Sequence, residues 1–132
     1  MAAPLSATAG RPEPDPDFAE LVAARPHLSA HAFDGLTVEE VPLARIAEAV
    51  GTPTWVYSAG ALRRRARSLR AALDGAGLSA SIHYAVKANG NLAVLRVLAA
   101  EGAGADVVSE GELRAARAAG MAPAHIVFSG VG

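Results

Sequence analysis

The sequence predicts an α/β fold that forms the first three strands of an incomplete (β/α)8 TIM-type barrel. From Ser81 onward, segments typical of strands and helices alternate in the order strand, helix, strand, helix, strand. The connections are a few residues long, which is typical of a parallel sheet with right-handed crossovers. A parallel sheet needs cover on both faces, and three strands within 132 residues do not supply it. We therefore expect the opening section of a truncated barrel rather than a very small three-stranded layer protein.

The composition indicates a globular protein and excludes several classes. Hydrophobic residues make up 52% of the chain and charged residues 19%. A net charge of −1 provides no basic field for nucleic acid, and we interpret the arginine run 63–65 as the solvated face of a helix. No cysteine is present, which excludes disulfides and thiolate metal sites. No apolar run approaches the roughly 20 residues of a membrane helix, so we expect no membrane association.

The first part of the chain shows little periodicity. Residues 12–17 alternate proline with acidic residues and carry no basic or apolar region of a signal peptide. The pattern stays weak from Phe18 to Leu36, so we expect residues 1–34 to be a flexible or weakly ordered extension. Residues 35–58 form a lead-in: an amphipathic helix that ends before Gly51, then a β-branched and aromatic strand from Thr54 to Tyr57.

A longer helix follows, with Ser58 as its cap and an apolar stripe opposite the arginines. The stripe consists of Leu62, Ala66, Leu69 and Leu73. The next strand is predicted from Ser81 to Val86. Because side chains alternate across a strand, Ile82, Tyr84 and Val86 share one face. Ser81, His83, Ala85 and Lys87 share the other.

The remaining elements complete the alternation. Asn89 or Asn91 can cap a helix whose buried stripe is Leu92, Leu95, Leu98 and Ala99. A strand from Ala105 to Val108 is followed by Ser109 and Glu112, which have the spacing of a capping box. The helix that they begin buries Leu113, Ala116 and Ala119, and the third strand spans Ile126 to Phe128.

Lys87 is the only lysine, whereas the other eleven Lys or Arg residues are arginines. Lysine can lose its proton and attack a carbonyl to form a Schiff base, but arginine stays protonated. The count alone leaves chance as an equal alternative. Its position favours chemistry, because Lys87 follows a predicted strand at its carboxyl end, where α/β proteins place their sites.

Other motifs carry less weight. Gly102 and Gly104 precede a strand instead of following one, which does not fit a dinucleotide-binding loop. The four histidines lack the spacing of metal ligands, so no metal site is expected. Asp106 lies in an otherwise apolar strand, where an acid is either a cap or the partner of a buried charge; the residues leave both alternatives open.

Three motifs occur in order along the chain. They are Tyr84-Ala85-Val86-Lys87-Ala88-Asn89, the run from Gly104 to Leu113, and Ile126-Val127-Phe128-Ser129-Gly130. Together they resemble the amino-terminal half of the diaminopimelate decarboxylase family, which belongs to the fold-type III, alanine racemase-like pyridoxal-phosphate enzymes. The resemblance covers roughly residues 35–132.

The resemblance implies roles for four residues. Lys87 would hold pyridoxal 5'-phosphate covalently, and Ala85 would lie beside the cofactor. Asp106 and Glu112 match acidic positions near that lysine in relatives. Close packing and helix capping remain alternatives for Ala85, Asp106 and Glu112. Residues 59–132 would begin the cofactor-binding barrel, and residues 35–58 would associate with a β domain that is missing here.

The resemblance also implies an activity. It would be the decarboxylation of meso-2,6-diaminopimelate to L-lysine in lysine biosynthesis, by a cytoplasmic homodimer that acts on a small amino acid. We expect the 132 residues alone to be inactive. The alternatives are another fold-type III amino-acid decarboxylase or racemase, and a non-catalytic protein that binds pyridoxal phosphate.

Overall fold

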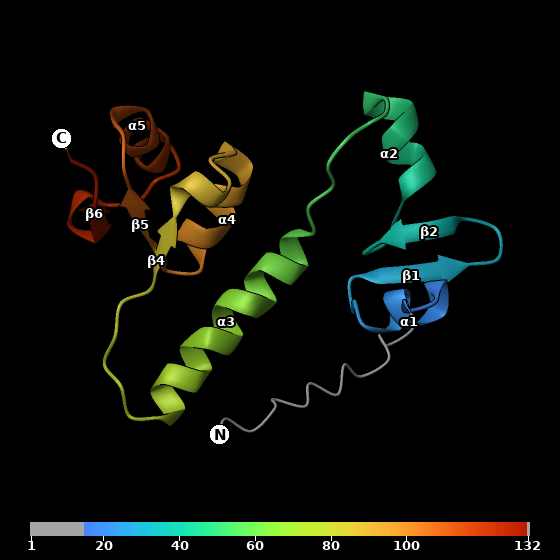
Figure 1. The fold of residues 1–132 in the computed structure, drawn as a ribbon, viewed down its shortest axis with the longest axis horizontal. Coiled ribbons are helices and arrows are strands. Elements are labelled where there is room, and N and C mark those ends of the chain that lie inside the picture. Colours follow the sequence, from blue (N-terminus) through green and yellow to red (C-terminus); the bar gives the residue numbers. More distant parts are fainter. Residues whose placement is uncertain (1–14, 132) are drawn as a thin grey trace, which may run out of the picture.

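The computed structural model describes residues 15–131, which form two small sheets and five α-helices (Figure 1). The antiparallel sheet contains β1 (Leu28–His31), β2 (Gly35–Val38) and β3 (Val41–Pro42), and the parallel sheet contains β4 (His83–Ala85), β5 (Gly104–Val107) and β6 (Ile126–Phe128). The helices are α1 (Phe18–Ala23), α2 (Leu43–Val50), α3 (Ala59–Gly75), α4 (Leu92–Ala100) and α5 (Glu110–Ala118), with 3-10 turns η1 (Val86–Ala88) and η2 (Pro123–His125). Within residues 15–131, no helix combines the length and the apolar character that crossing a bilayer requires.

The parallel sheet confirms the predicted α/β class. Its strands follow one another in the order β4-β5-β6, with α4 and α5 as the two crossovers. The register places Ala85 opposite Asp106, and Asp106 opposite Val127. These three residues therefore form one row across the sheet and point to the same face.

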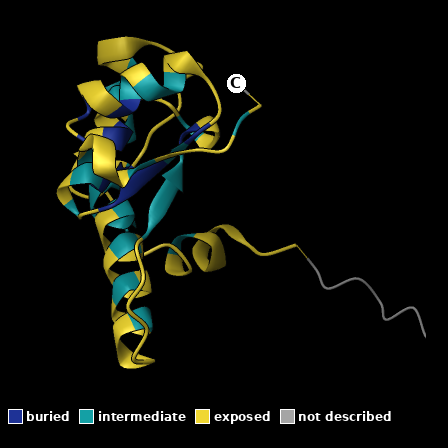
Figure 2. Cartoon of the chain, turned by 90° about the vertical axis from the view of Figure 1, so that its left-hand side faces the viewer, coloured by how far each residue is buried: buried dark blue, intermediate teal, exposed yellow. Residues whose placement is uncertain are grey.

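The core lies between one face of this sheet and both crossover helices. Ala105 and Val107 of β5 are fully buried against Leu95 of α4 and Ala116 of α5. Figure 2 shows the buried residues gathered in this part of the molecule. Because strand side chains alternate, the face with Ala85 and Asp106 points away from α4 and α5. That open face is the one that can receive a ligand.

Helix α3 packs against α4 beside this core. Leu62 and Ala66 of its predicted apolar stripe contact a second buried cluster formed by Val94, Leu98 and Ala103. Its Arg67 binds Glu101 through two hydrogen bonds, of 2.6 Å from Nε and 2.8 Å from Nη2. Arg63 Nε lies 3.8 Å from the same carboxylate, so two arginines tie α3 to the end of α4, while the run 63–65 is exposed as predicted.

The helix caps are mostly as predicted, because they depend on local spacing. The Ser58 hydroxyl accepts a hydrogen bond from Ala61 N at 2.8 Å and begins α3. Of the two candidates for α4, Asn91 is the cap, and its side chain accepts from Ala93 N at 2.9 Å. Asn89 instead supports the cap by accepting from Asn91 N at 2.9 Å.

Two strand predictions need correction. Residues 54–57 form no strand, since no segment of residues 15–131 pairs with them, and Trp55 is 88% exposed. Strand propensity reflects a fit to a half-buried surface and does not create a partner. The predicted strand from Ser81 to Val86 is shorter, and Val86 and Lys87 belong to the 3-10 turn η1. Strict alternation therefore ends at Ala85.

The amino-terminal segment differs from the weak order expected of residues 1–34. Residues 1–14 lie outside the described part of the chain. Beyond them, Asp17 and Glu20 form a capping box that begins α1, with hydrogen bonds of 2.8 and 2.9 Å. Strand β1 then pairs with β2, placing Leu28 opposite Val38. The two strands form a hairpin closed by residues 32–34, and strand propensity depends on side-chain packing that the weak pattern here does not show.

Glu39 joins the antiparallel sheet to the start of α3. It lies after β2, and its Oε1 accepts hydrogen bonds from Ser58 Oγ at 2.6 Å and from Gly60 N at 2.7 Å. The hydrogen bond from Ser58 holds the pKa of the Glu39 carboxyl below its ordinary 4.5, aided by Gly60 and by the charges of Arg64 and Arg63. A carboxylate also suits the positive end of a helix dipole.

This contact predicts a pH-dependent stability. Because the folded pKa of Glu39 is lowered, its stabilisation is present above about pH 4.5, the unfolded value, and is lost as the pH falls through the folded pKa. We expect Glu39→Gln to lower the melting temperature at neutral pH and to flatten the loss of stability on acidification. Melting curves from pH 3 to 7 test this, with Glu40→Gln as the control for removal of a neighbouring charge. Parallel pH profiles of wild type and Glu39→Gln would contradict the assignment.

Candidate functional site

The predicted site residues Ala85, Lys87 and Asp106 lie at the carboxyl end of the parallel sheet. Ala85 is the last residue of β4, and Lys87 follows two residues later in η1. Asp106 is the register partner of Ala85 on β5. The structure therefore places the amine, the small side chain and one carboxylate on neighbouring stretches at one edge of the sheet.

The turn that carries Lys87 is anchored on both sides. Val86 is only 1% exposed and fixes the turn in the core, while Lys87 beside it is exposed. The Tyr84 hydroxyl donates to Asn89 O at 3.4 Å. Burial raises the pKa of Tyr84, with a smaller contribution from Tyr57, so its phenol stays protonated as a donor. In the described residues Lys87 forms no ion pair, which leaves its amine available for chemistry.

Asp106 is half-buried on the open face, and the Ser129 hydroxyl donates a hydrogen bond to its Oδ1. This contact is neither a helix cap nor a pair with a buried charge, the two alternatives that the sequence left open. Ser129 was not among the predicted site residues. The sequence contained one signal for it, because Ser129 belongs to the third of the three ordered motifs.

Glu112 has a structural explanation of its own. Ser109 Oγ accepts from Glu112 N at 3.2 Å, which confirms Ser109 as the cap of α5. The reciprocal bond differs from a complete capping box, since the Glu112 carboxylate accepts from Val108 N at 2.8 Å, one residue before the cap. Among the described residues, no hydrogen bond or ion pair joins Glu112 to Lys87, and a role of Glu112 near the lysine stays a prediction.

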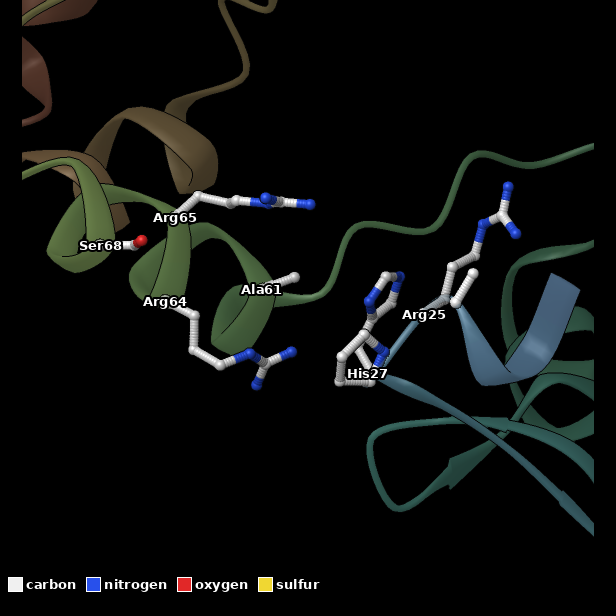
Figure 3. Close-up of a pocket in the computed structure, with 8 residues that line it drawn as sticks. Arg25, His27, Ala61, Arg64, Arg65 and Ser68 are labelled. Carbon is white, nitrogen blue, oxygen red and sulfur yellow. The ribbon is translucent and has the colours of Figure 1, made fainter. Parts of the chain in front are cut away.

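Two cavities lie away from this edge. A cavity of about 380 Å³ separates the α1–β1 connection from α3 and is lined by Arg25, His27, Arg64 and Arg65 among others (Figure 3). A smaller cavity of about 150 Å³ lies at the amino end of β4 and β5. Neither contains a predicted site residue. Lys87 itself is exposed to solvent.

The chemistry of this site suits a cofactor that carries an aldehyde. Lys87 supplies an exposed primary amine, which can bond to a carbonyl carbon. Ala85, half-buried at the end of β4, has a small side chain, and its register partner Asp106 adds a carboxylate. Within residues 15–131, no group of three or more His, Cys, Asp or Glu side chains converges as a metal site.

Comparison with known families agrees with this chemistry. Residues 59–132 match the family model of the pyridoxal-dependent decarboxylases, described as their pyridoxal binding domain. The chain belongs to this family. The resemblance inferred from the three motifs is thereby confirmed, and pyridoxal phosphate is the cofactor of the family.

The similar proteins are named diaminopimelate decarboxylases. The protein of that name from Zymomonas mobilis is 55% identical over 98 residues, which cover 74% of this chain and 23% of the relative. The Pseudomonas aeruginosa protein is 54% identical over 97 residues, with 74% and 23% coverage. The chain thus spans about a quarter of the length of the curated relatives it matches.

Solved structures give the same result. The crystal structure of AQ1208 from Aquifex aeolicus superposes with a TM-score of 0.74 at 42% identity, covering 82% of this chain and 26% of that one. Diaminopimelate decarboxylase from M. jannaschii in co-complex with L-lysine gives a TM-score of 0.65 at 31% identity, covering 78% and 24%.

Proposed function

We propose that this chain is the amino-terminal part of a diaminopimelate decarboxylase, which converts meso-2,6-diaminopimelate to L-lysine and carbon dioxide. One observation carries the proposal: in a member of the pyridoxal-dependent decarboxylases, the solitary lysine lies exposed at the carboxyl edge of the parallel sheet. The names of the relatives, at 54 and 55% identity, support this substrate over other amino acids.

The sheet is consistent with the first three strands of a fold-type III (β/α)8 barrel. Both crossover helices pack on the same face, as they do on the outside of such a barrel. The open face with Ala85 and Asp106 would then be the barrel interior. Barrel enzymes place their active sites at the carboxyl ends of the strands, where Lys87 lies.

Lys87 would do most of the chemistry that these residues contribute. When bound, pyridoxal phosphate supplies the electron sink for the charge left by loss of carbon dioxide. Lys87 Nζ would hold the cofactor covalently, release it to the substrate amine, and remain close enough to move a proton. Ala85 would leave room beside β4, and the Asp106 carboxylate would favour the protonated form of neighbouring nitrogen atoms.

The partners follow from the same proposal. The ligand is a small amino acid, in line with the L-lysine named in the M. jannaschii co-complex. The working protein would be a cytoplasmic homodimer with a β domain. Lys87 is exposed within residues 15–131, so further protein surface would have to close the site and exclude water.

Covalent trapping tests the proposal directly. The full gene product that carries these residues is incubated with pyridoxal phosphate, reduced with borohydride, digested and mapped by mass spectrometry. We expect the reduced adduct on Lys87, because this lysine lies exposed at the carboxyl edge of the sheet. Mapping of the adduct elsewhere, or no adduct, would refute the proposed role.

A comparison of substrates completes the test. The same preparation is offered meso-2,6-diaminopimelate, ornithine and arginine separately, and carbon dioxide and L-lysine are measured. We expect release from meso-2,6-diaminopimelate. Faster release from ornithine or arginine would keep the cofactor assignment and replace the substrate.

A further inference from the structure

The hydrogen bond between Ser129 and Asp106 joins two residues 23 positions apart on the open face of the sheet. Ser129 follows β6, and its backbone N donates to Val107 O at 2.9 Å, which continues the pairing of β6 with β5. Backbone pairing therefore fixes Ser129 beside Asp106, and the hydroxyl completes the contact.

The chain path around Ser129 is further restricted by Gly130. A Cβ atom at Gly130 would lie 2.8 Å from Val108 O and 2.9 Å from the Phe128 ring. Only glycine permits this approach of the segment after β6 to the end of β5. The position of the Ser129 hydroxyl is thus built into the backbone on both sides of the residue.

Asp106 depends on this hydroxyl for its orientation. In the described residues Asp106 forms no ion pair, and its row neighbours Ala85 and Val127 have apolar side chains that cannot donate. His83, on the same face, is directed to Ala105 O at 3.5 Å. A hydrogen bond to a charged acceptor is roughly twice as strong as a neutral one, so Ser129 can select one carboxylate rotamer.

We propose that Ser129 is a positioning residue that holds the Asp106 carboxylate on the open face, toward the sheet edge where Lys87 carries the cofactor. The inference rests on the proposed function of Lys87. Ser129 acts through Asp106. Its hydroxyl donates to Oδ1 and holds the carboxylate, whose negative charge would then favour the protonated form of the Lys87 nitrogen that carries the cofactor.

Spectroscopy of the full gene product tests this role in Ser129→Ala, Ser129→Thr and Asp106→Asn. The first readout is the pH midpoint of the absorbance change of bound pyridoxal phosphate. A nearby carboxylate favours the protonated form, so Asp106→Asn should move the midpoint to lower pH. Ser129→Ala should move it in the same direction by a smaller amount, and Ser129→Thr should restore the wild-type midpoint.

We also expect Ser129→Ala to lower kcat about tenfold with little change in KM.

The double variant separates positioning from an independent effect. If Ser129 acts through Asp106, Ser129→Ala adds nothing to the midpoint of Asp106→Asn. An additive shift, a wild-type midpoint in Ser129→Ala, or a threonine variant that behaves like alanine would each overturn the inference. Borohydride mapping keeps the two proposals apart, since loss of the Lys87 adduct in wild type refutes the proposed function. A retained Lys87 adduct with an unshifted Ser129→Ala midpoint refutes only the role of Ser129.

Discussion

Lys87→Arg is expected to abolish covalent attachment of pyridoxal phosphate and to lower decarboxylation by at least about a hundredfold. Arginine keeps the positive charge of Lys87 but remains protonated, so it can neither bond to the cofactor aldehyde nor move protons at working pH. Two measurements check this: borohydride trapping for the bond, and the visible absorbance of the bound cofactor. Retention of the wild-type absorbance in Lys87→Arg would contradict the role of Lys87.

An amine placed elsewhere provides the matched control. Arg96 is exposed on α4, so Arg96→Lys adds a second amine without disturbing the core. We expect Arg96→Lys alone to keep the adduct on Lys87, and Lys87→Arg combined with Arg96→Lys to form none. Trapping on position 96 in the double variant would show that an amine, rather than its position at the carboxyl edge, is sufficient.

Gly104→Ala is expected to destabilise the folded protein by about 1–3 kcal/mol or more, because β5 passes too close to its neighbours for a side chain at this position. A Cβ atom at Gly104 would collide with the carbonyl oxygen of His125 and would lie 2.8 Å from Nδ1 of His83. The carbonyl belongs to the backbone of the last residue of η2, directly before β6, and cannot rotate away. This collision could be relieved only if β5 moved away from β6.

Denaturant unfolding of the full gene product measures this effect, with Gly111→Ala as the control. Gly111 lies in α5, where an added Cβ would meet only Ser109 Oγ, at 3.9 Å. Alanine favours helix, so Gly111→Ala should keep or slightly raise the unfolding midpoint. Equal midpoints for Gly104→Ala and wild type would show that the sheet opens at little energetic cost.

Local patterns predicted the elements that depend on few neighbours. Apolar residues at helical spacing predicted α3, α4 and α5, and the caps Ser58, Asn91 and Ser109 begin them. The alternation of elements from Ser81 predicted the parallel sheet, since each crossover joins strands that are adjacent in sequence. The prediction failed at residues 54–57, where strand-like composition has no strand to pair with.

Contacts between distant residues were not predictable in this way. Glu39 reaches Ser58, 19 residues away, and Ser129 reaches Asp106, 23 residues away. Neither pair has a spacing typical of a cap or of a helix turn. Whether such partners meet depends on how the backbone between them folds. The capping spacing of Ser109 and Glu112 was correct, yet the Glu112 carboxylate bonds to Val108 N instead of the cap.

The sequence by itself determined the lone Lys87, the strand before it and the motifs that indicate the family, since each is a property of residue type and short spacing. Tertiary structure alone decided that Ala85 and Asp106 share a row, that Val86 anchors the lysine turn in the core, and that the Ser129 hydroxyl donates to Asp106. The physical reason is the distance along the chain over which each kind of interaction acts. Hydrogen-bonded turns and caps act within about four residues, whereas strand register and side-chain contacts across a sheet exist only after the crossovers have packed.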